Sequence, residues 1–442
     1  MQYTINCSVN IKIHKSEMNI NGLIKAVHDF SSYVIGKEFL TMIIETVDRQ
    51  HVSELRQAEP EKYEHRGYQE RRIKTSAGEL KLRFTRLRNR ETNKSTSPGL
   101  GFLNCPAYTR WTNEVVKDAA SLLPFMSFRN SSEEYAEQHG FSPGKSTIHR
   151  RLEDLVGNGD YRPELTKKQY KYLLVDGTGA RFQNRSEEQE GSFYKGEVRL
   201  AYASTGEVRP FELVGLWISK SWKECAEDLY SRISSKRLEV LISDGEEGIV
   251  SSFLLPHMRQ QRCYVHALRD LSFVLYADGQ KKNEQEEVFQ EVLRLPLLGG
   301  SQNDFEELTS ESIAEVKRAR DQIQTGLQEL ATATIAKGYR NAGTYLQRLS
   351  EPLVTCLDYF INTGRIVPIT SNYIERQIGL FKNRYNRVGR RWSEEGLAKW
   401  FAIAIRKLLP QFDWKECWKD IIGSKSAVEL KLQSCSITLL VP

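Results

Sequence analysis

The chain has 442 residues, of which 40% are hydrophobic and 27% charged, with a formal net charge of +6. This composition excludes a disordered chain, and the longest apolar stretches, such as residues 400–405, are far shorter than the roughly 20 residues of a membrane span. The seven cysteines are scattered without a Cys-x-x-Cys motif, and residues 1–30 show no signal-peptide pattern. We therefore expect a protein of the reducing cytoplasm that has no membrane partner.

The first hundred residues are expected to form an α+β region, residues 1–100. Apolar and polar residues alternate over residues 5–13, which predicts a strand, and a helical stretch follows to about Leu55. Residues 72–84 form two short alternating runs around a glycine turn and predict a hairpin. The turn-rich residues 91–101 are interpreted as a linker.

Positive charge is concentrated in two segments. Residues 71–90 hold eight Arg or Lys against one acid, and residues 376–391 hold six against none. A single cluster of this kind is more often a solvated basic face, but two clusters are typical of a protein that binds a polyanion. The charge pattern therefore favours a nucleic-acid partner.

Residues 101–165 are expected to form a helical region. Ser131 and Glu134 have the spacing of a capping box that opens a helix, which Gly140 would end, and the Ser-Pro pair at 142–143 would start another. Two helices joined by a short turn have the outline of a helix-turn-helix. Its candidate DNA contacts are Lys145, Arg150 and Arg151. Consecutive helices often share this outline, so a plain helical pair is the alternative.

Two apolar runs, residues 171–175 and 238–243, lead directly into Asp176-Gly and Asp244-Gly. An ordinary strand-to-loop turn produces the same pattern, because Asp and Gly are turn formers. Within residues 166–266, however, three expected strands are followed by alternating helices and strands, the last at residues 262–265. This is the order of an RNase H-like layer, whose first and fourth strands are neighbours. It predicts both aspartates at one edge of the sheet.

A long helical and charged segment, residues 267–370, follows and is expected to be an insertion. The core would resume in residues 371–410, where Glu375 lies near the start of a helix. Ile374 and Ile378 belong to the apolar face of that helix, which would turn Glu375 toward the aspartates. Asn372 and Glu375 also have the spacing of a helix cap, which is the alternative role of this Glu.

Three converging carboxylates would repel one another in a cleft of low dielectric and raise each other's pKa. A pair of Mg²⁺ or Mn²⁺ ions resolves this conflict, since both ions prefer oxygen ligands. Two such ions suit in-line phosphoryl transfer on nucleic acid. The remaining residues, 411–442, form a tail with a strand-like end that is expected to pair with the N-terminal strand.

A carboxylate triad in this order, with a helical insertion before the Glu, resembles the DDE transposases of prokaryotic insertion sequences. The Mutator-like lineage is the best match, and the resemblance covers about residues 171–400. The matching segments are residues 175–178, 242–245 and 371–376 running into 382–384, and the Cys-x-x-His motif of Cys263 and His266.

The resemblance implies an α/β fold with an RNase H-like catalytic domain, an all-α insertion and an N-terminal DNA-binding region. It implies metal-dependent cleavage at transposon ends and strand transfer into target DNA. Asp176, Asp244 and Glu375 match the metal-binding triad, with two Mg²⁺ or Mn²⁺ ions per active site. For Cys263 and His266 we expect DNA contacts beside that site, or else a buried Cys and a His at a strand-to-helix turn.

The second basic segment adds further candidate DNA contacts. These are Lys382, Arg384, Arg387, Arg390 and Arg391. Trp392 would either stack on an exposed base or lie in the protein interior.

The resemblance implies double-stranded DNA as partner, both transposon ends and target, and a homodimer or higher oligomer on that DNA. The expected location is the cytoplasm of a prokaryote, at the nucleoid. Two other functions stay open. One is an RNase H-fold nuclease or resolvase that cuts without joining. The other is a domesticated DNA-binding protein without catalysis, against which the presence of all three carboxylates argues.

Overall fold

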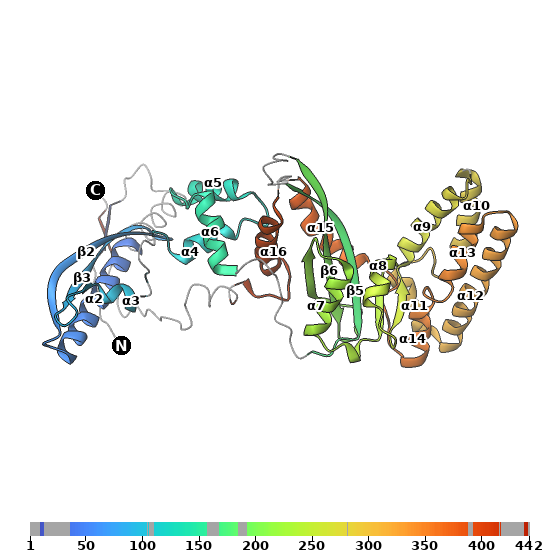
Figure 1. Cartoon of the computed structure of the whole chain (residues 1–442), viewed down its shortest axis with the longest axis horizontal. Coiled ribbons are helices and arrows are strands. Elements are labelled where there is room, and N and C mark those ends of the chain that lie inside the picture. The colour runs from blue at the N-terminus through green and yellow to red at the C-terminus, as the bar shows by residue number, and fades with distance from the viewer. Residues whose placement is uncertain are drawn as a thin grey trace. The chain divides into compact units, whose positions relative to one another are not determined.

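The computed structural model describes residues 9–12, 36–103, 105, 110–156, 168–183, 192–280, 282–387, 392–414, 416 and 437–440. The chain divides into two compact units, which are described separately (Figure 1). Unit 1 comprises residues 1–155 and 406–442, and unit 2 comprises residues 156–405. No helix among the described residues is long and apolar enough to cross a membrane.

Unit 1 contains a small sheet built from an antiparallel ribbon. The ribbon consists of β2 (Tyr63–Thr75) and β3 (Gly78–Asn89), and the short β4 (Ser95–Thr96) pairs with β3. One face of the ribbon packs against α2 (Gly36–Ala58). The hairpin predicted from residues 72–84 is thus confirmed and is longer than expected.

Residues 91–101 do not form a linker, and that prediction is wrong. They contain β4 and the start of α3 (Pro98–Phe102). Leu100 of α3 packs on the same buried cluster as the ribbon, and a Cβ at Gly99 would lie 1.9 Å from Oδ1 of Asp48. The turn-forming residues here allow a close approach of α3 to α2 instead of separating two domains.

Three further helices of unit 1 follow: α4 (Asn113–Ala120), α5 (Phe128–His139) and α6 (Lys145–Val156). The capping box predicted at Ser131 is wrong, because α5 begins three residues earlier, and the hydroxyl of Ser127 accepts from the amide of Asn130 at 3.1 Å. Ser131 is buried and donates to the carbonyl of Ala119. Gly140 ends α5 with a φ of 74°, as predicted.

The chain ends of unit 1 meet in a two-stranded parallel sheet. β1 (Val9–Lys12) pairs with β10 (Ile437–Leu440), and Val9 lies opposite Ile437. The predicted pairing of the tail with the N-terminal strand is therefore confirmed for these residues. Most of the 411–442 region lies outside the described residues.

Unit 2 contains a five-stranded sheet in the order β7-β6-β5-β8-β9. Its first three strands are antiparallel neighbours: β5 (Tyr172–Gln183), β6 (Phe193–Ser204) and β7 (Glu212–Ile218). β8 (Val240–Ser243) and β9 (Arg259–Arg262) are parallel to β5. The prediction that the first and fourth strands are neighbours is confirmed.

Two expected strand ends are wrong. β5 does not end at Asp176 but continues to Gln183, because its ladder with β6 extends through all twelve residues. β9 ends at Arg262, and Cys263 is the N-cap residue of the helix α9 (Tyr264–Ala277). Cys263 and Tyr264 are apolar because they form the buried start of a helix, whereas Val265 is exposed on it.

Helices cover the sheet and then continue as a separate group. α7 (Trp222–Arg232) packs on β7 and α8 (Glu247–Phe253) packs on β8, where their apolar faces join one core cluster. The expected helical segment contains α9, α10 (Lys282–Leu293), α11 (Gln302–Glu311), α12 (Ile313–Ala336), α13 (Arg340–Leu349) and α14 (Thr355–Thr363). Figure 1 shows these helices gathered beyond α8, on the far side of unit 2 from α7. α15 (Asn372–Arg387) and α16 (Glu394–Leu408) then follow.

Candidate functional site

Asp176 occupies the middle of β5, and its carboxylate is 8% exposed. Its Oδ1 accepts a hydrogen bond of 2.7 Å from the amide of Gly177. Burial raises the pKa of Asp176 to about 7, and the negative charges of Asp244 and Glu375 add to this increase. The three carboxylates therefore act on one another electrically, although they come from distant parts of the sequence.

Asp244 follows β8 at a position equivalent to Asp176. Leu174 pairs with Ile242 in the parallel ladder, so each Asp lies two residues beyond the same pair of neighbours. Oδ1 of Asp244 accepts from the amide of Glu246 at 2.9 Å. The two aspartates thus lie side by side on adjacent strands, as the sequence predicted, although only Asp244 lies at the end of its strand.

The turn after Asp244 requires a glycine. Gly245 has a φ of +80°, and a Cβ there would lie 1.5 Å from Nη1 of Arg262. Arg262 is buried, and its Nη2 forms an ion pair of 2.6 Å with Asp270 of α9. The buried guanidinium therefore fixes the turn that carries Asp244 to the start of the helical segment.

Glu375 lies in the first turn of α15, which packs against β5. Ile374, Ile378 and Phe381 are buried on one face of this helix, as the apolar pattern predicted. Glu375 is half-buried, and its Oε1 accepts a hydrogen bond of 2.9 Å from the hydroxyl of Ser371. Asn372 is the first residue of the helix and forms no described hydrogen bond to Glu375, so the structure does not support the helix-cap alternative.

Ser371 connects the Cys-x-x-His motif to Glu375. Its side chain is fully buried, its amide donates to Sγ of Cys263 at 3.2 Å, and its hydroxyl lies 3.1 Å from Nδ1 of His266. Burial alone would raise the pKa of Cys263, but hydrogen bonds from His266 and Ser371 hold it below its ordinary value. The hydrogen bond with Cys263 raises the pKa of His266. The arrangement matches the buried Cys at a strand-to-helix turn that was the alternative interpretation.

Two groups of potential metal ligands meet at this site. The ligand atoms of Cys263, His266 and Glu375 lie within 4.8 Å of one another, whereas the oxygens of the three carboxylates are not gathered this closely. Ser371, however, already satisfies all three ligands of the first group with hydrogen bonds. The negative charges of Asp244 and Glu375 add to the effect of burial in raising the pKa of Asp176, so a cation at this site would be stabilised by all three groups. Their hard oxygen donors therefore fit Mg²⁺ or Mn²⁺.

The predicted DNA contacts of the second basic segment are only partly described. Lys382 is exposed on α15. The side chains of Arg384 and Arg387, and all of Arg390 and Arg391, lie outside the described residues.

Trp392 occupies the interior position, not the base-stacking one. It is 9% exposed, its ring centroid lies 5.9 Å from that of Trp400, and its carbonyl accepts from the amide of Gln183 at 2.8 Å. The end of β5 therefore holds this Trp against α16.

In unit 1, Lys145 and Arg150 are exposed on α6. Arg151 is half-buried and donates to the side chain of Asn113 in α4. Of the three predicted contacts on this helix, two are accessible to a partner and one also supports the packing of the helices.

Sequence patterns missed three residues around the site. Ser371 precedes Glu375 by four positions, one helical turn, and this spacing could have suggested the contact. Trp222 and Glu246 had no such signal. Nε1 of Trp222 donates to Glu246 at 2.7 Å, and the guanidinium of Arg199 lies 4.2 Å from the Trp222 ring centroid. This Trp packs beside the backbone of Gly177, next to Asp176.

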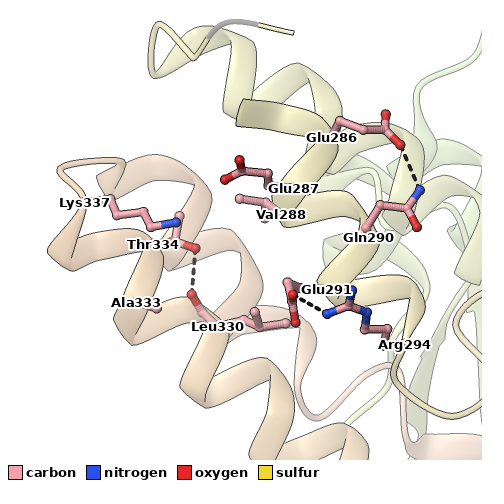
Figure 2. Close-up of a pocket in the computed structure, with 10 residues that line it drawn as sticks. All are labelled: Glu286, Glu287, Val288, Gln290, Glu291, Arg294, Leu330, Ala333, Thr334 and Lys337. Atoms are coloured by element: carbon pink, nitrogen blue, oxygen red, sulfur yellow. Dashed lines mark hydrogen bonds and ion pairs between the residues drawn. The ribbon is translucent and has the colours of Figure 1, made fainter. Parts of the chain in front are cut away.

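A pocket of about 390 Å³ lies elsewhere, between α10 and α12 (Figure 2). Figure 2 shows Glu287 and Lys337 on opposite sides of it, and the pairs Gln290–Glu286 and Arg294–Glu291 bonded within α10. None of the predicted site residues lines this pocket. The candidate site is therefore the group of carboxylates on β5, β8 and α15, not this pocket.

Comparison with known proteins gives the family. The sequence profile described as "Transposase, Mutator family" matches residues 13–341. This range includes Asp176, Asp244, Cys263 and His266 but ends before Glu375, whose assignment depends on the structural contacts above. No curated protein matches the chain.

Among solved structures, the chain is similar to one described as "Drosophila P element transposase strand transfer complex". The sequence identity is 10% and the TM-score is 0.36, and the match covers 67% of this chain and 92% of the other. A similarity this low supports no functional comparison. The family profile spans most of the chain and shows the family directly. The protein belongs to the Mutator family of transposases.

Proposed function

We propose that the chain cuts DNA at transposon ends and transfers the cut strand into target DNA, using Asp176, Asp244 and Glu375 as ligands of two Mg²⁺ or Mn²⁺ ions. The observation that carries this proposal is geometric. Asp176 and Asp244 lie two residues beyond the same pair of neighbours on adjacent parallel strands, and Glu375 lies on α15, which packs against β5, in a chain of a transposase family. The pKa of Asp176, raised by burial and by the two other carboxylates, agrees with this convergence. The strand order of the sheet is consistent with an RNase H-like catalytic domain.

Each carboxylate is oriented by a hydrogen bond from the protein itself. The amide of Gly177 holds Asp176, the amide of Glu246 holds Asp244, and the hydroxyl of Ser371 holds Glu375. Bound divalent ions would supply activation of the attacking oxygen and stabilisation of the leaving oxygen. The protein's own part is to fix these oxygens and to bring the scissile phosphate beside them.

The proposed domains follow from this assignment. The catalytic regions, 166–266 and 371–410, fall almost entirely in unit 2, together with the helical region 267–370. The proposed DNA-reading regions, 1–100 and 101–165, fall mainly in unit 1. Double-stranded DNA is the proposed partner of both units.

The proposal is tested with the purified chain and duplex DNA from both flanks of its own gene. We expect strand cleavage with Mg²⁺ and none with a chelator, and we expect the released 3′ end to become joined to a second duplex. Cleavage without any joined product would favour the nuclease alternative. Binding without either reaction, at all Mg²⁺ and Mn²⁺ concentrations, would favour the non-catalytic one.

A further inference from the structure

The β2–β3 ribbon of unit 1 has one covered face and one exposed face. Ile73, Leu80, Leu82 and Phe84 are buried on the covered face and pack with apolar residues of α2 and α3. Successive residues of a strand point to opposite sides, so the residues between them belong to the other face. Its exposed members in this part of the ribbon are Tyr68, Glu70, Arg72, Lys81 and Arg83, and the half-buried pair of Lys74 and Glu79 continues the same face.

The exposed face carries two cations directly opposite each other. Arg72 pairs with Lys81 in the antiparallel register, and neither side chain has an ion-pair partner among the described residues. Like charges at directly opposed positions destabilise a sheet. The repulsion between Arg72 and Lys81 therefore destabilises the folded ribbon. A bound anion would attract both side chains and offset this repulsion.

The neighbouring residues extend the same positive surface. Arg83 lies 3.5 Å from Glu70 across the ribbon, and its guanidinium is 5.9 Å from the ring centroid of Tyr68. Glu70 is the single acid among the five exposed residues of this face, against three cations, and the half-buried Lys74 and Glu79 add one charge of each sign. Tyr68 is 58% exposed and is the only large apolar surface that the face presents.

We propose that the exposed face of the β2–β3 ribbon is a duplex-DNA-binding surface, with Arg72 and Lys81 contacting phosphates. A two-stranded ribbon fits the major groove of B-form DNA, which is about 12 Å wide. This surface is separate from the exposed residues of α6, and it rests on the proposed function only in taking DNA as the partner. Nothing in it depends on the carboxylate site of unit 2.

Other anionic partners fit this face less well. The deep, narrow major groove of duplex RNA does not admit a ribbon. A membrane surface would be expected to take up several exposed apolar side chains, and this face has one aromatic ring among four charged residues. The combination of directly opposed cations with an exposed two-stranded ribbon therefore favours duplex DNA.

The test uses the full chain with the Arg72→Glu substitution. This change places an acid opposite Lys81, so a structural view predicts a melting temperature equal to or above that of the wild type. The DNA-binding proposal predicts weaker binding to a labelled 30-base-pair duplex. The expected loss is on the order of tenfold at 0.1 M salt, and the slope of log K against log salt falls by about one.

A matched control is Lys236→Glu, which makes the same charge change on an exposed residue of the short 3-10 helix Ser235–Arg237 in unit 2. Arg72→Thr, with a residue suited to strands, guards against an unexpected folding defect. Binding is measured with a chelator present, so the result is independent of cleavage.

Unchanged DNA affinity in both Arg72 variants would overturn the proposal. An equal loss in Lys236→Glu would also overturn it, because the effect would then be one of net charge. The proposal would also be overturned if a duplex RNA or anionic phospholipid vesicles bound as tightly as the DNA and lost affinity equally in the Arg72 variants. A chain that cleaves no DNA but shows the expected Arg72 effect would remove the proposed catalysis and leave the ribbon surface intact.

Discussion

The hydroxyl of Ser371 donates a hydrogen bond of 2.9 Å to Oε1 of Glu375. The same hydroxyl lies 3.1 Å from Nδ1 of His266, and the Ser371 amide donates to Sγ of Cys263. The first turn of α15 is thereby bonded to the first turn of α9. His266 also approaches Glu375 directly, with Nδ1 3.6 Å from Oε1, so the Cys-x-x-His motif contacts Glu375 both directly and through Ser371.

Replacing Ser371 by Ala is expected to weaken metal use without unfolding the protein. The Glu375 carboxylate would lose the group that orients it, and such supporting contacts typically contribute about 10–100-fold to metal affinity or activity. The measurement is DNA cleavage over a Mg²⁺ titration, in which the variant should need more metal. Ser371→Thr keeps the hydroxyl and should recover part of the loss.

Ser393→Ala provides the control for this substitution. The Ser393 hydroxyl accepts from the amide of Gly396 at the start of α16, so its loss should cost about 1 kcal/mol of stability. It should leave the metal requirement unchanged. An identical Mg²⁺ titration for Ser371→Ala and the wild type would show that Ser371 does not position Glu375.

Alanine substitution of Asp176, Asp244 or Glu375 is expected to abolish strand cleavage and to leave DNA binding largely intact. Each change removes one proposed metal ligand, while the regions proposed to read DNA fall mainly in unit 1. Cleavage is measured in Mg²⁺, and binding is measured in a chelator. Wild-type cleavage by any one variant would remove that residue from the site.

The raised pKa of Asp176 predicts how stability depends on pH in the absence of metal. The pKa is about 7 in the folded protein against an ordinary value of 3.8, so folding favours the protonated carboxyl. Asp176 therefore does not lower the free energy of unfolding below about pH 4, where it is protonated in both states. Its destabilising effect grows as the pH rises to about 7. Asp176→Asn should raise the free energy of unfolding at pH 8 by about 2–4 kcal/mol and leave it unchanged at pH 4.

Asp304 supplies a control of opposite sign. Hydrogen bonds from the amide and hydroxyl of Ser301 hold the pKa of Asp304 below its ordinary value, so its stabilisation is present at neutral pH and is lost as the pH falls. Asp304→Asn should lower the melting temperature at pH 8. If Asp176→Asn also lowers it there, the assignment of Asp176 as a buried, disfavoured anion is wrong.

Arg150 and Arg151 are expected to respond differently to charge reversal, although they are neighbours. Arg150→Glu should weaken binding to DNA from the element's ends and reduce the salt slope by about one, because Arg150 is exposed on α6. Arg151→Glu should also lower the melting temperature, since Arg151 donates to Asn113. Comparison with scrambled DNA of equal length tests specificity: equal affinity of the wild type for both would leave α6 a non-specific role.

The protein is expected to act as at least a dimer on paired DNA ends. One triad serves one site, and joining two ends requires two strand transfers at a fixed spacing, which two protomers supply by symmetry. The helical segment 267–370 is the proposed contact surface, and α9 exposes Phe273 and Tyr276 at 66% and 76%. Replacing both by Ser should reduce assembly on cleaved end DNA, measured by light scattering. Concerted joining by a complex with a single protomer would contradict the prediction.

The pairing of the two aspartates could be predicted from sequence, because two apolar runs of strand length each lead into an Asp. The continuation of β5 beyond Asp176 could not. Gly177 and Gly179 signal a turn locally, whereas twelve residues of ladder with β6 keep the segment extended. Long-range pairing decided the outcome against local preference.

The contacts of Ser371 had the same limitation, because Cys263 and His266 are more than one hundred positions away. The capping box predicted at Ser131 was wrong for the opposite reason. Its spacing to Glu134 matched a capping box, but the hydroxyl is buried and bonded to Ala119 of the preceding helix. A local pattern of two residues does not indicate which groups tertiary packing will cover.

The pairing of β1 with β10 has a consequence for how the protein is made. Val9 and Ile437 are 428 positions apart (437 − 9), so their ladder can form only after residue 440 has been synthesised. Unit 2, by contrast, is continuous from residue 156 to residue 405 and is complete on the growing chain before that. Domains generally fold as they emerge during translation. Unit 2, the proposed catalytic unit, would therefore fold before β10 has been synthesised and before the β1–β10 sheet can form.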